Sequence, residues 1–280
     1  MKKILLILIL ISNFTYAQDL TATKYTANNK GKFFVYWGGN RESYTKSDIN
    51  FSGKNYNFTV ENATANDKPK GWHIDYFNPA RMTIPQTNFR LGYFISNKYA
   101  VSIGIDHMKY VMNQNQTAAV NGFINLDSNN PAAIHNGIYN GNSKVLTEDF
   151  LTFEHTDGLN YVNAEMARYD DISKWIGLPN TDKFQINTVG GMGMGFLYPK
   201  TNAQVLSKIR YDDYHISGYG VSAKVGLNFT FFKHFFIQTE LKGGYINLPD
   251  VKTTFDDADG AKHEFMFLQR IITIGGIFRV

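Results

Sequence analysis

Apolar and polar residues alternate strictly over long stretches of this chain. The clearest stretch is 219–231, in which Val221 and Phe229 belong to an apolar set and Lys224 and Asn228 to a small or polar set. Successive side chains of a β-strand point to opposite faces, so the pattern predicts a strand with one apolar and one polar face. A strand that crosses a membrane needs about 9–11 residues, and this stretch is long enough.

The same alternation marks nine further segments as expected strands. They cover residues 33–37, 49–51, 56–60, 89–95, 99–105, 161–169, 184–198, 235–245 and 265–280. A closed barrel satisfies all of them, because the apolar faces can meet lipid while the polar faces line the lumen. The expected fold is therefore all-β, a transmembrane antiparallel up-and-down β-barrel of about ten strands, with eight and twelve left open. A soluble periplasmic β-sandwich is the competing class.

Loop lengths orient this expected barrel. Barrels of the outer membrane have short periplasmic turns and longer external loops. The short connections Ser96–Lys98 and Phe232–His234 are therefore expected on the periplasmic side. The long external connections are expected at 62–85, 113–158, 199–217 and 249–264. The longest, 113–158, is the most plausible place for surface recognition, since loops of this size tend to be functional or to carry structure of their own.

The N-terminus has the form of a secretory signal peptide. Lys2 and Lys3 precede an unbroken apolar run, 4–11, which is too short for a membrane helix, and Thr15–Ala17 offers small residues for cleavage. The expected organisation is a signal peptide over 1–17, a flexible periplasmic leader over 18–30 and an outer-membrane barrel with long external loops over 31–280. The expected location is the outer membrane of a Gram-negative bacterium.

Composition excludes several other classes. The chain has no cysteine, so it is neither a disulfide-stapled domain nor a lipoprotein anchored through an N-terminal cysteine. Its formal charge is +4, and without Lys2 and Lys3 there are 26 basic against 24 acidic residues. This near balance argues against a nucleic-acid partner. The 22 Phe, 17 Tyr and 3 Trp suit the aromatic girdles of a membrane barrel.

Charged residues of both signs are expected inside the lumen, where they would pair and close a narrow bore. The set is Asp48, Glu61, Arg90, Asp106, Glu165, Lys224, Glu240 and Lys242. At this strand number side chains fill most of a barrel, so a wide diffusion pore is not expected. Gly191, Gly193 and Gly195 also face the lumen, and either bulky neighbours fill the space beside them or a small cavity remains.

Two clusters could carry chemistry. By alternation Asp106 faces the lumen, whereas His107 and Lys109 face lipid near the external rim, so Asp106 cannot orient His107 without a bulge. His107 and Lys109 are therefore interpreted as contacts for lipopolysaccharide phosphates, and no catalytic residue is assigned. Residues 256–260 resemble a calcium-binding acidic turn without the full twelve-residue pattern, so a solvated acidic loop is the preferred interpretation and no metal is assigned.

Four motifs carry a family resemblance. They are Tyr36–Arg41, Thr45–Ile49, Tyr56–Val60 and Asp106–Val111. With the signal peptide they make the chain similar to uncharacterised outer-membrane β-barrel proteins of the Bacteroidota, over most of its mature length. The resemblance implies a fold and a location but no activity. Val280 differs from the terminal Phe common in proteobacterial barrels, and Phe278 is expected to take the aromatic role.

The expected function is that of an integral outer-membrane barrel with a structural, binding or accessory envelope role through its external loops. One alternative is an enzyme that modifies lipid A or phospholipid, motivated by His107 at the rim, although no serine–histidine–acid set is evident. The other is a narrow channel for a small or apolar solute, motivated by the glycines of the lumen wall. Outer-membrane lipid and lipopolysaccharide are the expected partners, with an envelope protein as a possible further one, and no cofactor is expected.

Overall fold

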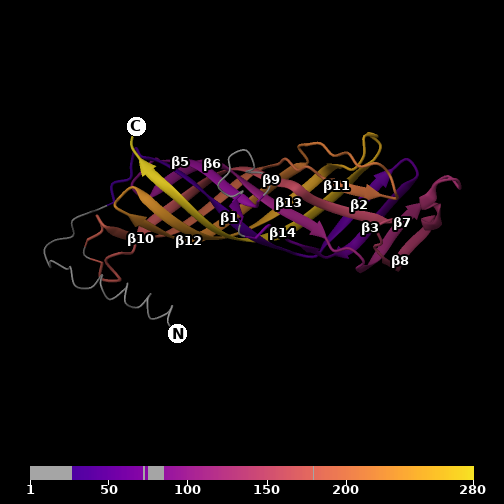
Figure 1. Cartoon of the computed structure of the whole chain (residues 1–280), viewed down its shortest axis with the longest axis horizontal. Coiled ribbons are helices and arrows are strands. Elements are labelled where there is room, and N and C mark those ends of the chain that lie inside the picture. The colour runs from indigo at the N-terminus through magenta and orange to yellow at the C-terminus, as the bar shows by residue number, and fades with distance from the viewer. Residues whose placement is uncertain (1–26, 72, 75–84, 179) are drawn as a thin grey trace.

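The computed structural model describes residues 27–71, 73–74, 85–178 and 180–280 (Figure 1). The expected signal peptide and most of the expected leader lie outside these residues. The described strands are β1 (Phe33–Tyr44), β2 (Ser47–Gly53), β3 (Tyr56–Ala63), β4 (Ala65–Asn66), β5 (Thr87–Phe94), β6 (Tyr99–Met112), β7 (Thr117–Ile124), β8 (Gly137–Val145), β9 (Leu151–Asp171), β10 (Phe184–Leu197), β11 (Asn202–Val205), β12 (Gly218–Phe231), β13 (Phe235–Lys252) and β14 (Gly260–Phe278). A 3-10 helix spans Pro131–His135. None of the described helical segments has the length and apolar character needed to traverse a bilayer.

Eight of these strands close into a ring. Going round it, the order is β1, β5, β6, β9, β10, β12, β13 and β14, and every neighbouring pair is antiparallel. The ring closes because β1 pairs with β14 along its whole length, from Phe33 opposite Phe278 to Tyr44 opposite Phe267. Closure leaves no unpaired sheet edge in the ring, as a membrane-spanning sheet requires. The expected antiparallel barrel is confirmed.

The outer face of the ring is an apolar belt. On β14, Met266, Leu268, Ile272 and Ile274 are exposed, whereas Phe267, Gln269, Ile271 and Thr273 on the other face are buried. Exposed apolar side chains continue round the neighbouring strands in the same alternation. Arg270 interrupts the set and lies opposite Arg41 of β1. Long arginine side chains can carry their charge toward the membrane interface, so the belt still suits lipid contact.

The other four long strands and two short ones form a cap above one end of the ring. β2 pairs with the first residues of β14, where Ile49 lies opposite His263, and β3, β7 and β8 follow in order. β4 adds to β6 and β11 to β9. Figure 1 shows β7 and β8 at the end of the molecule opposite the C-terminus. We call β2, β3, β4, β7, β8 and β11 the cap.

The cap has an apolar core of its own, which the upper ends of β6, β9, β13 and β14 help to enclose. Its fully buried members include Phe51, Phe58, Tyr110, Phe153 and Leu248. Phe51 stacks on Phe58 with ring centroids 5.4 Å apart, and Phe153 meets Phe51 edge to face at the same separation. Burial of several aromatic and aliphatic side chains makes the cap a folded layer, since each contributes about 1.5–3 kcal/mol.

The strand count differs from the expectation of about ten. All ten expected segments are strands, and the described residues contain four more: β4, β7, β8 and β11. These four lie in segments expected to be external loops. Most of β8 is polar and exposed, and β4 has two residues, so neither shows the apolar alternation that marks a strand. β2 and β3, expected in the barrel wall, belong to the cap.

Inward glycines make room for inward aromatic rings in the narrow bore. A Cβ at Gly92 would lie 2.0 Å from Cζ of Phe34, and one at Gly275 would lie 2.3 Å from Cζ of Phe236. Both rings are buried in a second apolar cluster near the end of the ring that carries the short turns. The cluster is Phe34, Tyr36, Phe94, Ala100, Ala167, Tyr169, Val189, Phe236 and Ile277. These glycines therefore set how tightly the lower bore packs.

We predict that Gly92→Ala destabilises the folded barrel, because the new methyl group collides with the Phe34 ring. The expected loss is about 1–3 kcal/mol in the free energy of unfolding, the usual effect of overpacking. Gly243→Ala is the matched control, since its Cβ would meet nothing closer than 3.7 Å. Urea titration followed by the gel mobility of folded and unfolded protein measures both. Equal losses in the two variants would contradict the packing role.

Candidate functional site

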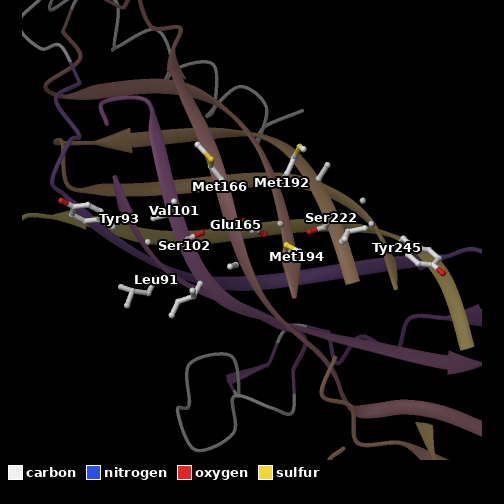
Figure 2. A pocket seen from close by; sticks show the side chains of 18 of the residues that line it. Leu91, Tyr93, Val101, Ser102, Glu165, Met166, Met192, Met194, Ser222 and Tyr245 are labelled. Atoms are coloured by element: carbon white, nitrogen blue, oxygen red, sulfur yellow. The ribbon is translucent and has the colours of Figure 1, made fainter. Parts of the chain in front are cut away.

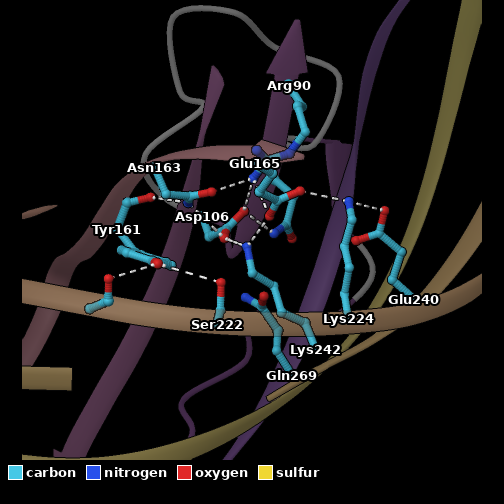
Figure 3. A network of polar contacts seen from close by, with 12 residues as sticks. Arg90, Asp106, Tyr161, Asn163, Glu165, Ser222, Lys224, Glu240, Lys242 and Gln269 are labelled. Carbon is cyan, nitrogen blue, oxygen red and sulfur yellow. Dashed lines mark hydrogen bonds and ion pairs between the residues drawn. The ribbon is translucent and has the colours of Figure 1, made fainter. Parts of the chain in front are cut away.

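A closed network of six charges fills the middle of the bore (Figure 3). Glu165 of β9 lies at its centre and contacts all three cations: Arg90 at 3.0 Å, Lys224 at 2.7 Å and Lys242 at 2.7 Å. Each of these three side chains is no more than 3% exposed. One carboxylate thus joins strands β5, β9, β12 and β13 across the ring.

Two further carboxylates complete the charge balance. Asp106 of β6 pairs with Lys242 and lies 3.5 Å from Arg90, and Glu240 of β13 lies 2.9 Å from Lys224. The network therefore holds three cations and three anions. Buried ions are costly unless they are paired and their remaining hydrogen-bonding groups are satisfied, and this balance meets the first requirement.

Polar side chains on neighbouring strands meet most of the second requirement, although Nη1 of Arg90 has no hydrogen-bond partner among the described residues. Asn88 and Asn163 donate to Asp106 at 2.7 and 3.1 Å, and Arg90 donates to Asn163 at 2.8 Å. Tyr36 donates to Glu240 at 3.0 Å. Every strand of the ring except β10 and β14 supplies one of these groups, so the network fixes the bore from most sides.

Eight charged residues were expected in the lumen, and six of them form this network. Asp48 and Glu61 lie elsewhere. Asp48 is exposed and accepts the backbone N–H of Asn62 at 2.8 Å, while half-buried Glu61 accepts from Asn121 at 2.5 Å. The expectation for these two is wrong because β2 and β3, which carry them, belong to the cap instead of the ring.

The glycine-lined wall of β10 is packed. A Cβ at Gly193 would lie 2.6 Å from Cγ of Glu165, and one at Gly195 would lie 2.7 Å from Cβ of Asn163. Of the two interpretations of these glycines, filling by neighbours is therefore the one observed. With the aromatic cluster below the network and the cap core above it, side chains occupy the bore of the described barrel at three successive levels.

A hollow with a volume of about 1,020 Å³ is lined chiefly by outward-facing apolar residues of the ring, together with buried Ser102, Glu165 and Ser222 (Figure 2). Met166, Met192 and Met194 line it, together with small residues such as Ala164 and Ala223. Met192 and Met194 are each 67% exposed. Because the hollow is on the apolar belt, flexible methionine side chains and small neighbours offer an adaptable surface to lipid chains.

His107 does not lie on the surface as expected. It is 3% exposed, and its Nδ1 lies 2.7 Å from Oδ1 of Asn160. β6 and β9 remain paired above the belt, with an irregularity after Met108, and Asn160 of β9 thereby covers the imidazole. Lys109 is half-buried, and its carbonyl accepts the hydroxyl of Tyr44 at 2.8 Å. The expectation that His107 meets lipopolysaccharide is therefore wrong, while Lys109 keeps a partly exposed side chain.

The acidic turn at 256–260 is held by a cation from the chain itself. Both carboxylate oxygens of buried Asp259 accept from Lys208, at 2.7 and 2.8 Å, and Tyr56 and Thr254 donate to the same carboxylate. Asp256 pairs with exposed Lys54 at 3.2 Å. Among the described residues no three histidine, cysteine or acidic side chains are grouped so as to hold a metal ion.

Two stacked histidines lie buried in the cap core. The rings of His155 and His263 are 6.4 Å apart, and both lie against Tyr110 and Phe153. His155 contacts Thr201 at 2.9 Å and His263 contacts Ser47 at 2.8 Å. Burial lowers the pKa of His155 to about 3 and that of His263 well below its ordinary value. Both rings are therefore neutral in the folded protein.

A polar cleft of about 510 Å³ opens between the cap and the upper ends of β6 and β9. Charges of both signs line it, including Asp67, Lys68, Glu154 and Arg210. Lys68 and Glu154 form an ion pair of 3.4 Å. Thr152 and five side-chain amides also line it: Asn66, Asn113, Gln114, Asn202 and Gln204. Apolar side chains complete its walls: Val111, Met112, Phe153 and Ala203. Neither the motifs nor the alternation indicated this cleft, because its walls come from segments expected to be loops.

Comparisons with known proteins bear on the fold. No protein-family model matches the chain, and no curated protein matches its sequence. Similar solved structures include the outer membrane protein OprG from Pseudomonas aeruginosa, with 11% identity and a TM-score of 0.41, covering 91% of this chain and 99% of that chain. Ail of Yersinia pestis has 10% identity and a TM-score of 0.33, with 89% and 99% covered. Neisserial surface protein A has 8% identity and a TM-score of 0.36, with 90% and 100% covered.

These identities and TM-scores are low, so the fold assignment rests on the closed ring, its apolar belt and its polar interior. On those observations the chain has the fold of an outer-membrane β-barrel protein.

We predict that Glu165→Gln costs about 3–5 kcal/mol in the free energy of unfolding, because it leaves three buried cations with two anions. Asp170→Asn, at the far end of the same strand, removes a carboxylate from exposed pairs with Lys98 and Arg168 and is the control. Its expected cost is about 0–1 kcal/mol. Urea unfolding of both variants in detergent micelles gives the comparison. A Glu165→Gln barrel as stable as the control would contradict the central role of Glu165.

The buried histidines make stability depend on pH. Unfolding exposes rings that take up protons near pH 6.5, whereas the folded rings stay neutral, so the unfolded state binds more protons below that pH. Stability is therefore highest above about pH 6.5 and falls as pH decreases toward about pH 3, by up to about 1.4 kcal/mol per pH unit for each histidine.

Urea midpoints between pH 7.5 and pH 4.5 measure this slope. His155→Phe should remove the contribution of one histidine, because a phenyl ring of similar shape cannot be protonated. His234→Asn, at an exposed position in the turn between β12 and β13, is the control for the removal of a histidine outside the cap core. An identical slope in His155→Phe and the wild type would show that His155 is not a source of the pH dependence.

Proposed function

We propose that this chain is an integral outer-membrane β-barrel whose cap faces the outside of the cell and has a structural, binding or accessory role in the envelope. The observation that carries the proposal is the division of the molecule into two parts. The ring has a filled bore and an apolar exterior, which suits anchoring in a membrane. The cap has its own core and a polar cleft, which suits contact with molecules outside it.

Orientation follows from the connections of the ring. Short turns join β5 to β6 and β12 to β13 at the end where β1 begins and β14 finishes, and the cap stands at the other end. In outer-membrane barrels the short turns are periplasmic, so the cap is external. The N-terminal sequence supports a cleaved signal peptide over 1–17 and a leader over 18–30, and the four motifs support a relationship to barrels of the Bacteroidota.

Partners follow from the same surfaces. The apolar belt and its hollow meet outer-membrane lipid, and Lys109, above the belt and partly exposed, is a candidate contact for lipopolysaccharide phosphates. The cleft offers paired charges and amides to a polar ligand or to a segment of another envelope protein. Two alternatives have less support: burial of His107 removes the residue that motivated a lipid-modifying enzyme, and packing at Gly193 removes the wall that motivated a channel.

Peptide tags test location and orientation together. We predict that a tag inserted at Asn129, between β7 and β8, is labelled by antibody on intact cells, because the cap is external. A tag inserted after Asn97, in the turn between β5 and β6, should be labelled only after the outer membrane is permeabilised. Both proteins should fractionate with the outer membrane.

Two further experiments separate the proposed role from its alternatives, one with the purified protein and one with cells that lack it. Planar bilayers should show no discrete conductance, since side chains fill the bore, and deletion of the protein should leave phospholipid and lipid A unchanged in mass spectra. A labelled tag at Asn97 on intact cells would overturn the orientation. A reproducible conductance or a new lipid species would replace the proposal with the matching alternative.

A further inference from the structure

The connection between β9 and β10 carries two exposed apolar side chains at the end of the ring that has the short turns. It spans residues 172–183 and is longer than the β5–β6 and β12–β13 turns at the same end. Trp175 is 86% exposed, and the neighbouring Ile176 is 52% exposed. A tryptophan side chain has a large apolar surface and a single polar N–H group, so an environment that is apolar on one side and wet on the other suits it.

Hydrogen bonds hold the first half of this connection against β10. The backbone N–H of Ile172 donates to the carbonyl of Ile186, and the N–H of Ile186 donates to Oγ of buried Ser173, each at 3.0 Å. The N–H of Trp175 donates to the carbonyl of Ile172 at 3.0 Å, and that of Leu178 to the carbonyl of Ser173 at 2.9 Å. An ordered turn therefore presents Trp175, which lowers the entropic cost of covering its side chain.

This connection leaves the ring at the level of an aromatic girdle. Phe184, the first residue of β10, lies opposite Phe231 of β12, with ring centroids 5.1 Å apart. Across the ring, Phe33 contacts Tyr93 at 4.9 Å and Phe278 at 6.3 Å. Aromatic girdles of this kind mark the boundary between acyl chains and headgroups. Figure 1 shows the connection extending to one side of the ring beyond β10, which is the side where a lipid leaflet lies.

Two lysines bracket the apolar pair. Lys174 directly precedes Trp175, Lys183 ends the connection, and both side chains are exposed. The acidic residue beside Lys183, Asp182, pairs with Lys233 of the neighbouring turn at 2.9 Å. Tryptophan and lysine side by side are typical of a membrane interface, where the indole ring lies among the headgroups and the ammonium group is attracted to anionic lipid.

We propose that this connection is a membrane anchor. Trp175 and Ile176 insert at the boundary between headgroups and acyl chains, and Lys174 and Lys183 contact the phosphates of anionic phospholipids. The lipid surface is the occupant that the position favours, because the connection starts where the apolar belt and its girdle end. The inference rests on the barrel crossing a membrane, and the orientation proposed above decides only that the leaflet is the periplasmic one.

Fluorescence of proteins with a single tryptophan tests the anchor in lipid vesicles. The chain has three tryptophans, so Trp37→Phe together with Trp72→Phe leaves Trp175 alone. Two control proteins also carry Trp175→Phe and receive a new tryptophan elsewhere. One is Ile272→Trp, at a 63% exposed position of the belt, and the other is Ile138→Trp, at an 87% exposed position of the cap. Gel mobility confirms that each protein is folded.

Phospholipids that carry bromine near the headgroup should quench Trp175 about twofold more than those that carry it near the chain end, because tryptophan anchors lie at the interface. The Ile272→Trp protein should show the reverse order. The Ile138→Trp protein should be quenched by aqueous acrylamide and by neither lipid.

The two lysines are tested by adding phosphatidylglycerol to the phosphatidylcholine vesicles. The anionic lipid should increase bromine quenching of Trp175, and Lys174→Gln combined with Lys183→Gln should remove this increase. Lys46→Gln combined with Lys54→Gln, which removes two exposed cations flanking the cap strand β2, is the matched control and should keep it.

Three outcomes would overturn the proposal in different ways. Acrylamide quenching of Trp175 as strong as in the Ile138→Trp protein, without quenching by lipid, would place the connection in water and leave it to a soluble partner. No lipid quenching in the Ile272→Trp protein would contradict the membrane-spanning ring itself, and the anchor with it. Equal quenching of Trp175 with and without phosphatidylglycerol would show that the lysines do not contact anionic phospholipid.

Discussion

The contacts of Glu165 with three cations are the interaction on which the barrel interior depends. A small ring must fill its bore, and four of the strands converge on this one carboxylate. Its neighbours then have little freedom: Gly193 must lack a side chain, Asp106 and Glu240 must carry the remaining negative charges, and amides must complete the hydrogen bonds. Such a network is stable only as a whole, because loss of one ion leaves others buried without a partner.

Apolar side chains fill the interior on either side of the charge network. Toward the short turns, the rings of Phe34 and Phe236 pack directly against glycines on facing strands. The bore is too narrow there for a second large side chain beside each ring. Toward the cap, Phe51, Phe58 and Phe153 build a core of the kind found in water-soluble domains. The molecule thus combines a barrel that is polar at its centre with a cap that is apolar at its centre.

The two parts meet where ring strands continue beyond the belt. β9 and β14 run from the lower ring into the cap, and at this level the side-chain amide of Gln86 donates to the carboxylates of both Glu42 and Asp67. Charge is balanced below this level and apolar packing dominates above it.

Two-residue alternation by itself determined the ring, because a side chain in a strand can reach only one of two faces. The faces of Arg90, Asp106, Glu165, Lys224, Glu240 and Lys242 follow from that rule. Tertiary structure alone decided which strands pair. β2 and β3 pair in the cap instead of the barrel wall, so Asp48 and Glu61 lie outside the lumen. Asn160 of β9 contacts His107, which is buried as a result. The polar cleft and the Glu42–Asp67 pair also required it, since they join residues whose proximity depends on long-range pairing and loop packing. No local pattern in the sequence encodes that proximity.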